Sequence, residues 1–440
     1  MSLTVTIGVI VLIVLMVTGI PVAFAFLGAA SIMAIVGGYS TGFMVPYGFA
    51  KINSIILLAM PMFILAGSIM EFGGIGEKLV NAGNKLFGRI KGGLGILVIV
   101  ACGIFGAISG SSTAALSCIG SILKTPLEEK KYPKPIVGAL VANAAIIGIL
   151  IPPSIIMVLF GWAGNISVLA CFLATVMPGL LTIGIFCVIT IFLLRKENIQ
   201  VVTSEELAAQ RKTVKRDENG KRIWGSGPAL VMPFLILGGI YTGLFTPTEA
   251  AAVSCIYAIP VGFLIYRELN AKTFYQAMAK AGLTSGVILI TTFGTNILSR
   301  IFIDEKLPQV LIDALLFISE DKRIILIMVN LFLMIIGMLM SDTAATLLCT
   351  PILVPVMVGL GFDPVHFAAI FAVNIGFANV TPPCAPLLYL SGKVMDVDVK
   401  ELLRPNTWYL LAGWLPVLLV TTYWEDFSLF LPRLILGYGA

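Results

Sequence analysis

Long apolar segments, separated by short polar ones, recur along the whole chain. Ten of them approach the length of about 20 residues that a helix needs to cross a bilayer. They cover residues 3–20, 21–37, 54–70, 93–108, 168–194, 228–244, 248–266, 283–298, 324–340 and 407–424. The pattern predicts an all-α polytopic membrane protein embedded in a lipid bilayer.

Two polar, glycine- and serine-rich stretches stand out because they lie among apolar residues. "SGSSTAAL" at 109–116 matches "LMSDTAATL" at 339–347 with an offset of 230 residues. The same offset relates "IPPS" at 151–154 to "TPPC" at 381–384. Two motifs in one register indicate an internal repeat. We therefore expect repeat 1 at 1–194, a basic loop at 195–224 and repeat 2 at 225–440.

The basic residues orient this repeat in the membrane. When the basic loop is placed in the cytoplasm and the spans are counted outward, 22 of the 28 Lys and Arg residues lie on the cytoplasmic side, as the positive-inside rule requires. Both chain ends are then expected on the periplasmic side of a bacterial cytoplasmic membrane. Segments 72–91 and 299–322 are too polar to span, and we expect them to contribute short helices at the membrane surface.

The orientation also predicts two re-entrant hairpins. The flanks of each polar stretch lie on the same side of the membrane, so hairpin 1 (about 93–123) and hairpin 2 (about 324–358) enter from opposite faces. The Pro-Pro motifs interrupt the next spans, at about 135–162 and about 364–392. Inverted repeats with broken helices and a site at the membrane midplane are typical of secondary transporters.

The hairpin tips and helix breaks carry the candidate chemistry. Irregular backbone at membrane depth is tolerated where it is buried in protein or lines a wet cavity, and its carbonyls and hydroxyls suit small hard cations. One wall of the site is expected from the tips and the other from the breaks, with one cation in each half and an organic substrate between. The expected substrate contacts are Ser111, Ser112, Asn143, Pro153, Asp342, Asn374 and Pro383.

Structural roles for the same residues remain open. Clusters of Gly and Ser also let helices pack closely, and Asn143 and Asn374 could each hydrogen-bond a neighbouring helix. An acid at membrane depth is functional by default, so Asp342 could be a cation ligand, a proton carrier or a substrate contact. Alternatively, Asp342 could belong to a structural pair or cap the returning helix of the hairpin.

Composition supports this interpretation and excludes others. The chain is 58% hydrophobic and 12% charged, about half the charge of a soluble protein. Its net charge of +5 follows from the cytoplasmic segments, and no basic block alternates with aromatics as a nucleic-acid surface would. Its seven cysteines form no CxxC motif, so neither a disulfide scaffold nor a cysteine metal site is expected.

The whole chain resembles the large membrane subunit of the tripartite ATP-independent periplasmic (TRAP) transporters. The resemblance rests on "GIPVAFAFLGAAS", "LLAMPMFILAGSIM", "GIFGAISGSSTAA", "NAAIIGILIPPSI", "FTPTEAAAVS", "MLMSDTAA" and "NIGFANVTPPCAPLLYL". It implies sodium-driven uptake of a small organic acid, such as a C4-dicarboxylate or sialic acid, by an elevator-like fold in which a transport domain moves against a scaffold.

The resemblance also implies partners and ligands. A periplasmic substrate-binding protein delivers the solute, and a small four-helix membrane subunit accompanies the large one; because this chain begins at the large subunit's first helix, a separate polypeptide is expected for the small one. Carried onto this sequence, the residues around Na⁺ are Ser109, Gly110, Ser111, Ser112, Thr113, Gly148 and Pro152 in the first half, and Ser341, Asp342, Thr343, Gly376, Asn379, Thr381 and Pro382 in the second.

Two other functions compete with transport. An intramembrane serine protease could use a serine of "GAISGSS" with His366, the only histidine, as its base. We expect His366 at the periplasmic surface, away from Ser109, which disfavours an enzyme. A passive channel would also use hairpin filters, usually through subunit symmetry around a pore.

Overall fold

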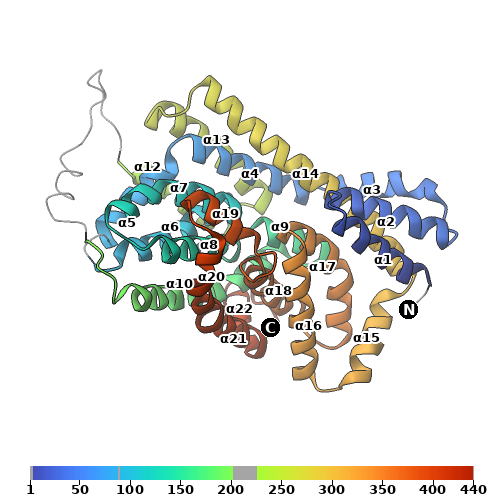
Figure 1. Ribbon diagram of the computed structural model, residues 1–440. Coiled ribbons are helices and arrows are strands. Elements are labelled where there is room, and N and C mark those ends of the chain that lie inside the picture. The colour runs from blue at the N-terminus through green and yellow to red at the C-terminus, as the bar shows by residue number, and fades with distance from the viewer. Residues whose placement is uncertain (1–2, 88–89, 202–224, 440) are drawn as a thin grey trace.

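The computed structural model describes residues 3–87, 90–201 and 225–439, and these are helical apart from short connections (Figure 1). The helices are α1 (Leu3–Val17), α2 (Val22–Val36), η1 (Thr41–Phe43), α3 (Met44–Ile52), α4 (Ile55–Phe72), α5 (Ile75–Phe87), α6 (Gly93–Ser109), α7 (Ser112–Glu129), α8 (Lys134–Leu150), α9 (Ile155–Gly164), α10 (Val168–Leu194), α12 (Gly227–Tyr241), α13 (Pro247–Pro260), η2 (Val261–Tyr266), α14 (Ala271–Asp304), α15 (Leu307–Ile318), α16 (Lys322–Leu339), α17 (Asp342–Gly359), α18 (Pro364–Asn379), α19 (Pro386–Met395), α20 (Val399–Trp408), η3 (Tyr409–Trp414), α21 (Leu415–Tyr423) and α22 (Glu425–Leu436).

The outer faces of these helices are apolar. Among the described residues, six helices are long and apolar enough to cross a bilayer, and α8 with α9, bent by 44° at their junction, would form a seventh span. Leu180, Val188 and Phe192 of α10 are exposed, although the same helix buries Phe172 and Phe186. Apolar side chains on both faces are what a helix between a protein core and lipid requires.

One layer of the protein consists of long helices that lie side by side along the upper edge of Figure 1. Helices α4 and α13 run in the same direction, since Thr248 Oγ1 donates to Ile55 O and Cys255 Sγ lies 3.1 Å from Met62 O. Helix α14 packs on α4 and on α2. We call α4, α13 and α14 the long-helix layer.

The second layer holds two helical hairpins and two broken helices. Helices α6 and α7 form hairpin 1, α16 and α17 form hairpin 2, and the breaks separate α8 from α9 and α18 from α19. Each hairpin packs closely on the broken helix of its own half. A Cβ added to Gly106 would lie 2.0 Å from Gly148 Cα, and one added to Gly337 would lie 2.6 Å from Ala378 Cβ. These equivalent contacts lie 231 and 230 residues apart in the sequence, so the internal repeat is present in the packing as well.

Several expectations can now be compared with the fold. The two short helices predicted outside the spans are present as α5 and α15. Helix α14 continues to Asp304 and so includes the first residues of the polar segment 299–322. Most of the predicted basic loop, residues 202–224, lies outside the described residues. The domain boundaries stay predictions.

The prediction that His366 lies at the periplasmic surface was wrong. Its side chain is 3% exposed in α18, and its Nε2 lies 2.7 Å from Thr421 O. The ring is therefore held in the core of the second half by a backbone carbonyl.

Candidate functional site

The tip of hairpin 1 is formed by a left-handed glycine followed by a helix cap. Gly110 has φ of +64° and its N–H donates to Gly106 O, which ends α6. Ser111 then caps α7, where its Oγ accepts a 3.4 Å hydrogen bond from the N–H of Ala114. Its Oγ also lies 3.0 Å from Thr113 Oγ1. The tip thus presents two adjacent hydroxyls.

The tip of hairpin 2 has the same kind of serine cap, but Met340, at the position of Gly110, has an extended backbone, and the tip carries a charge. Ser341 caps α17 through a 3.4 Å bond from the N–H of Ala344, and Asp342 is the first residue of that helix. Asp342 Oδ1 accepts from the N–H of Thr343 at 2.8 Å and from its hydroxyl at 3.4 Å. A carboxylate in the first turn of a helix is stabilised by the helix dipole.

The two tips meet at equivalent positions of the repeat. Ser112 Oγ donates to Asp342 Oδ2 over 3.4 Å, and these two residues are 230 positions apart, which is the offset of the sequence motifs. The approximate symmetry of the two halves therefore relates the two partners of this contact to each other. Half one contributes a hydroxyl and half two a carboxylate, so the symmetric positions differ in charge.

The first helix break packs directly on its hairpin tip. The N–H of Ile155 donates to Gly110 O at 3.2 Å, and Pro152 and Pro153, joined by a cis peptide bond, are buried behind it. The hydroxyl oxygens of Ser109 and Ser154 are buried without a hydrogen-bond partner. Other buried oxygens of the described residues also have no such partner, but these two lie where tip 1 meets the first break, so they are placed to serve as neutral ligands there. Ser154 was missed by the sequence analysis, although its motif "IPPS" was identified.

The second break is more exposed than the first. Asn379 and Thr381 are buried, and Thr381 Oγ1 donates to Phe377 O at 2.7 Å. Pro382 and Pro383 are exposed and line a separate cavity of about 340 Å³ together with Tyr389, Asp398 and Lys400. The structure therefore does not bring the second Pro-Pro motif to the place where the tips meet.

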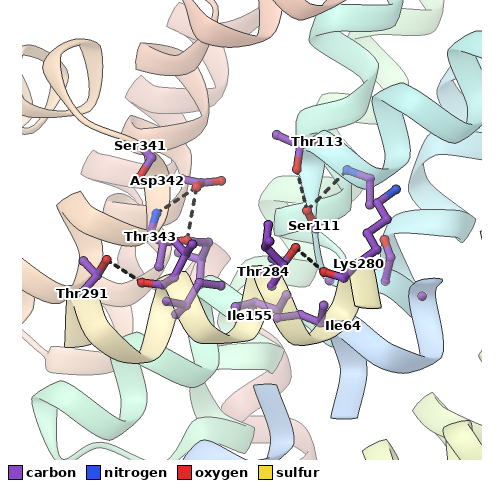
Figure 2. A pocket seen from close by; sticks show the side chains of 18 of the residues that line it. Ile64, Ser111, Thr113, Ile155, Lys280, Thr284, Thr291, Ser341, Asp342 and Thr343 are labelled. Carbon is purple, nitrogen blue, oxygen red and sulfur yellow. Dashed lines mark hydrogen bonds between the residues drawn. The ribbon is translucent and has the colours of Figure 1, made fainter. Parts of the chain in front are cut away.

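A larger cavity, of about 590 Å³, joins both tips to the long-helix layer (Figure 2). It is lined by the start of α2, by one face each of α4 and α14, by both tips and by the start of α9. Of the predicted residues it contains Ser109, Gly110, Ser111, Thr113, Ser341, Asp342 and Thr343. Two charged residues missed by the sequence analysis, Glu71 and Lys280, also line it. Each is a charged residue at the edge of an apolar segment, which is the signal that could have found them.

The remaining predicted residues lie in the packed interior. Asn143 donates to Ala139 O and Asn406 Oδ1, and its Oδ1 accepts from the indole N–H of Trp414. Asn374 donates to Asn330 Oδ1 and Ile370 O. Neither asparagine lines the cavity at the tips, so the helix-to-helix role left open for them describes their contacts.

Two predicted glycines are packing positions. Gly148 faces Gly106, and a Cβ on Gly376 would lie 2.6 Å from Ile146 Cγ2. Among the described residues, no three His, Cys, Asp or Glu side chains are grouped as they would be around a metal ion. The ligands on offer at the tips are hydroxyl and carbonyl oxygens with one carboxylate, a set that suits hard cations rather than transition metals.

Comparison with known proteins shows which family this chain is similar to. Residues 9–426 match the family model described as the tripartite ATP-independent periplasmic transporter, DctM component. The sialic acid TRAP transporter large permease protein SiaM of Vibrio cholerae is 34% identical over 427 residues, covering 97% of each chain. The C4-dicarboxylate large permease DctM of Pseudomonas aeruginosa is 33% identical over 386 residues, covering 86% of each.

One further relative is longer. The isethionate TRAP transporter permease protein DctMQ of Oleidesulfovibrio alaskensis is 34% identical over 417 residues, which cover 93% of this chain and 63% of that protein.

Two solved structures share the fold. The YdaH transporter of Alcanivorax borkumensis superposes with a TM-score of 0.62 at 15% identity, covering 88% of this chain and 87% of that one. MtrF of Neisseria gonorrhoeae superposes with a TM-score of 0.59 at 14% identity and 96% coverage of both. At such identities the likeness concerns the fold alone.

Proposed function

This chain belongs to the DctM family, the large permease component of tripartite ATP-independent periplasmic transporters, and we propose that it couples uptake of a small organic acid to a sodium gradient. Members of the family are secondary transporters that work with a substrate-binding protein, and they are not enzymes. The cavity agrees with this, since His366 is not among the described residues that line it.

One observation carries the proposal: the tips of two repeat-related hairpins line a single cavity and touch each other through the hydrogen bond from the buried Ser112 to Asp342. Polar tips inside an apolar protein are tolerated where they are buried in protein or line a wet cavity, and both tips line this one. The unpartnered hydroxyls of Ser109 and Ser154 beside the tip-1 carbonyls fit a cation held by neutral oxygens. At the second tip, the Asp342 carboxylate would supply a charged ligand.

A cation at these tips also explains how an acid could bind there. A substrate carboxylate close to Asp342 would be repelled, and a bound Na⁺ would offset that repulsion, so solute and ion would favour each other's binding. We therefore infer a carboxylate solute, such as a C4-dicarboxylate or a sialic acid, as the cargo. A periplasmic substrate-binding protein and a small membrane subunit are the proposed partners.

The cavity extends from Thr291 to Lys280 along α14, towards the end of that helix that the basic residues assign to the cytoplasm. We infer that this arrangement is open to the cytoplasm. Alternating access would then require the hairpins and broken helices to move against the long-helix layer, as in an elevator.

Transport in proteoliposomes with the binding protein tests the proposal. Uptake should require an inward sodium gradient and should not occur with potassium alone. Asp342→Asn removes a charged ligand and should raise the sodium concentration for half-maximal uptake about tenfold or more; Ser112→Ala removes a neutral one and should raise it about two- to tenfold.

The matched control is Ser254→Ala, because Ser254 is a buried serine of α13 that donates to Ala250 O and does not line the cavity. Sodium dependence unchanged in both tip variants would leave the tips as packing devices only. Uptake that needs no sodium gradient would refute the coupling.

A further inference from the structure

The side chains of Lys280 and Glu71 form an ion pair in the lining of the large cavity. Lys280 Nζ of α14 lies 2.7 Å from both carboxylate oxygens of Glu71 at the end of α4. Lys280 is the one basic side chain among the described residues that line the cavity. Figure 2 shows Lys280 and Thr284 on the side of the Ser111 tip, while Thr291 lies beside Thr343.

The cavity therefore has the Asp342 carboxylate at one end and the Lys280–Glu71 ion pair at the other. Lys280 and Thr291 are eleven residues apart on one helix, which corresponds to about 16 Å along its axis. At the Thr291 end an anionic solute meets the Asp342 carboxylate, and at the other end it meets an ammonium group. Once a neutralising cation has left the tips, Asp342 repels an anion, and at the other end Lys280 attracts that anion as soon as Glu71 is displaced from it.

The ion pair is placed so that a solute can reach it. The Lys280 side chain is 43% exposed and that of Glu71 is 22% exposed, so solvent screens the attraction between them and separating them costs little. A lysine ammonium has three donors and can turn from one carboxylate to another. A carboxylate that arrives through the cavity can therefore replace Glu71 on Lys280.

We propose that Lys280 is the outlet residue for the anionic group of the solute: it exchanges Glu71 for the solute carboxylate as the solute leaves the hairpin tips. This deepens the proposed function and rests on it. Glu71 is then a competitor that returns to Lys280 and releases the solute into the cytoplasm.

The first test needs no substrate. Thr284→Cys places a thiol one helical turn from Lys280, in a background with Cys384→Ser because Cys384 is the exposed cysteine among the described residues. The thiol is modified with an anionic and with a cationic methanethiosulfonate. At about 6 Å in water, one charge changes each rate about threefold.

Lys280→Gln should slow the anionic reagent and speed the cationic one, whereas Glu71→Gln should do the reverse. Equal effects of both reagents, or none, would show that Lys280 does not set the potential of the cavity and would overturn the proposal. Because this readout involves no transport, it holds or fails separately from the proposed function.

The second test measures exchange of internal solute in proteoliposomes, with succinate and N-acetylneuraminate as probes. Lys280→Gln should raise the internal concentration for half-maximal exchange about three- to tenfold, less than for a fully buried partner because Lys280 is partly exposed. Glu71→Gln removes the competitor and should lower that concentration, and Lys280→Arg should stay near the parent protein. Sodium dependence should be unchanged in all three.

A purely structural ion pair predicts another result. Both single variants would then impair exchange in the same direction, and the charge-swapped Lys280→Glu/Glu71→Lys protein would recover; either outcome overturns the proposal. The matched control is Lys78→Gln. Lys78 pairs with Glu268 at 3.4 Å, also between neighbouring elements of the fold, but outside the cavity.

Discussion

Gly67 tests whether the hairpins separate from the long-helix layer. It lies on α4 where that helix touches tip 1, and a Cβ added there would come within 2.9 Å of Ser109 Cβ and 3.0 Å of Ser109 Cα. Neither atom is the end of a flexible side chain, so one of the two elements must shift. Overpacking of this kind costs about 1–3 kcal/mol.

The cost of Gly67→Ala applies only while tip 1 lies against α4. If the two elements separate in the alternate state, the variant can escape the clash by changing state. The equilibrium between the two states of the variant should then shift by about 5- to 150-fold away from the state in which tip 1 lies against α4. The melting temperature should fall little, since the alternate state keeps its own packing.

Gly106→Ala is the contrasting variant, because its clash lies inside one half. Its Cβ would meet Gly148 Cα at 2.0 Å, and both glycines belong to elements that we expect to move together. No change of state relieves that contact, so this variant should lose about 3 kcal/mol or more, with a clear drop in melting temperature. Gly184→Ala, with no atom within 4 Å of the added Cβ, should leave stability and state unchanged.

Thermal unfolding of the purified protein measures the loss of stability, and alkylation from one side of the membrane measures the shift between the two states. Ala114→Cys places a thiol in the cavity at tip 1, and an impermeant reagent applied to oriented vesicles reports the side from which it is reached. Gly67→Ala should raise labelling from the periplasmic side. If Gly67→Ala instead melts as early as Gly106→Ala and the labelling stays unchanged, tip 1 does not leave α4 and the elevator proposal fails.

Three further predictions concern stability and orientation. Asn143→Leu leaves one buried donor and one buried acceptor unpaired and should cost about 2–6 kcal/mol by thermal unfolding, whereas Asn374→Leu leaves one acceptor and should cost about 1–3 kcal/mol; equal costs would contradict the hydrogen-bond assignment. Cysteines at Asn198 and Glu320, both exposed, should be labelled only from the cytoplasm and only from the periplasm, respectively, and the reverse pattern would overturn the orientation. Lys124 of α7 donates a hydrogen bond to Asp396 and lowers the pKa of that carboxyl group. The stabilising effect of this pair is therefore present above the ordinary aspartate pKa and is lost as the pH falls through the lowered value. Asp396→Asn should flatten the melting temperature between about pH 5 and pH 3, and an unchanged acid profile would count against this pair.

The sequence alone determined the parts of the protein that depend on local pattern. Apolar length predicts the helices, because a backbone in lipid must satisfy its own hydrogen bonds. The left-handed Gly110 and the capping Ser111 and Ser341 specify both tips within a few residues, so the tips could be identified before any packing was known. The offset of 230 residues likewise revealed the repeat, since equivalent halves need equivalent local motifs.

Only the tertiary structure decided which of these motifs face one another. The contact of Ser112 with Asp342 joins residues 230 positions apart, and that of Lys280 with Glu71 joins residues 209 apart. No local pattern encodes such a distance, because it follows from how complete helices pack. The same packing turned Asn143 into the interior and the second Pro-Pro motif towards another cavity, although their sequence context resembles that of residues at the site. The motif shared by the two repeats thus fixes the same serine cap at both tips, while neighbouring helices decide which surfaces reach the cavity.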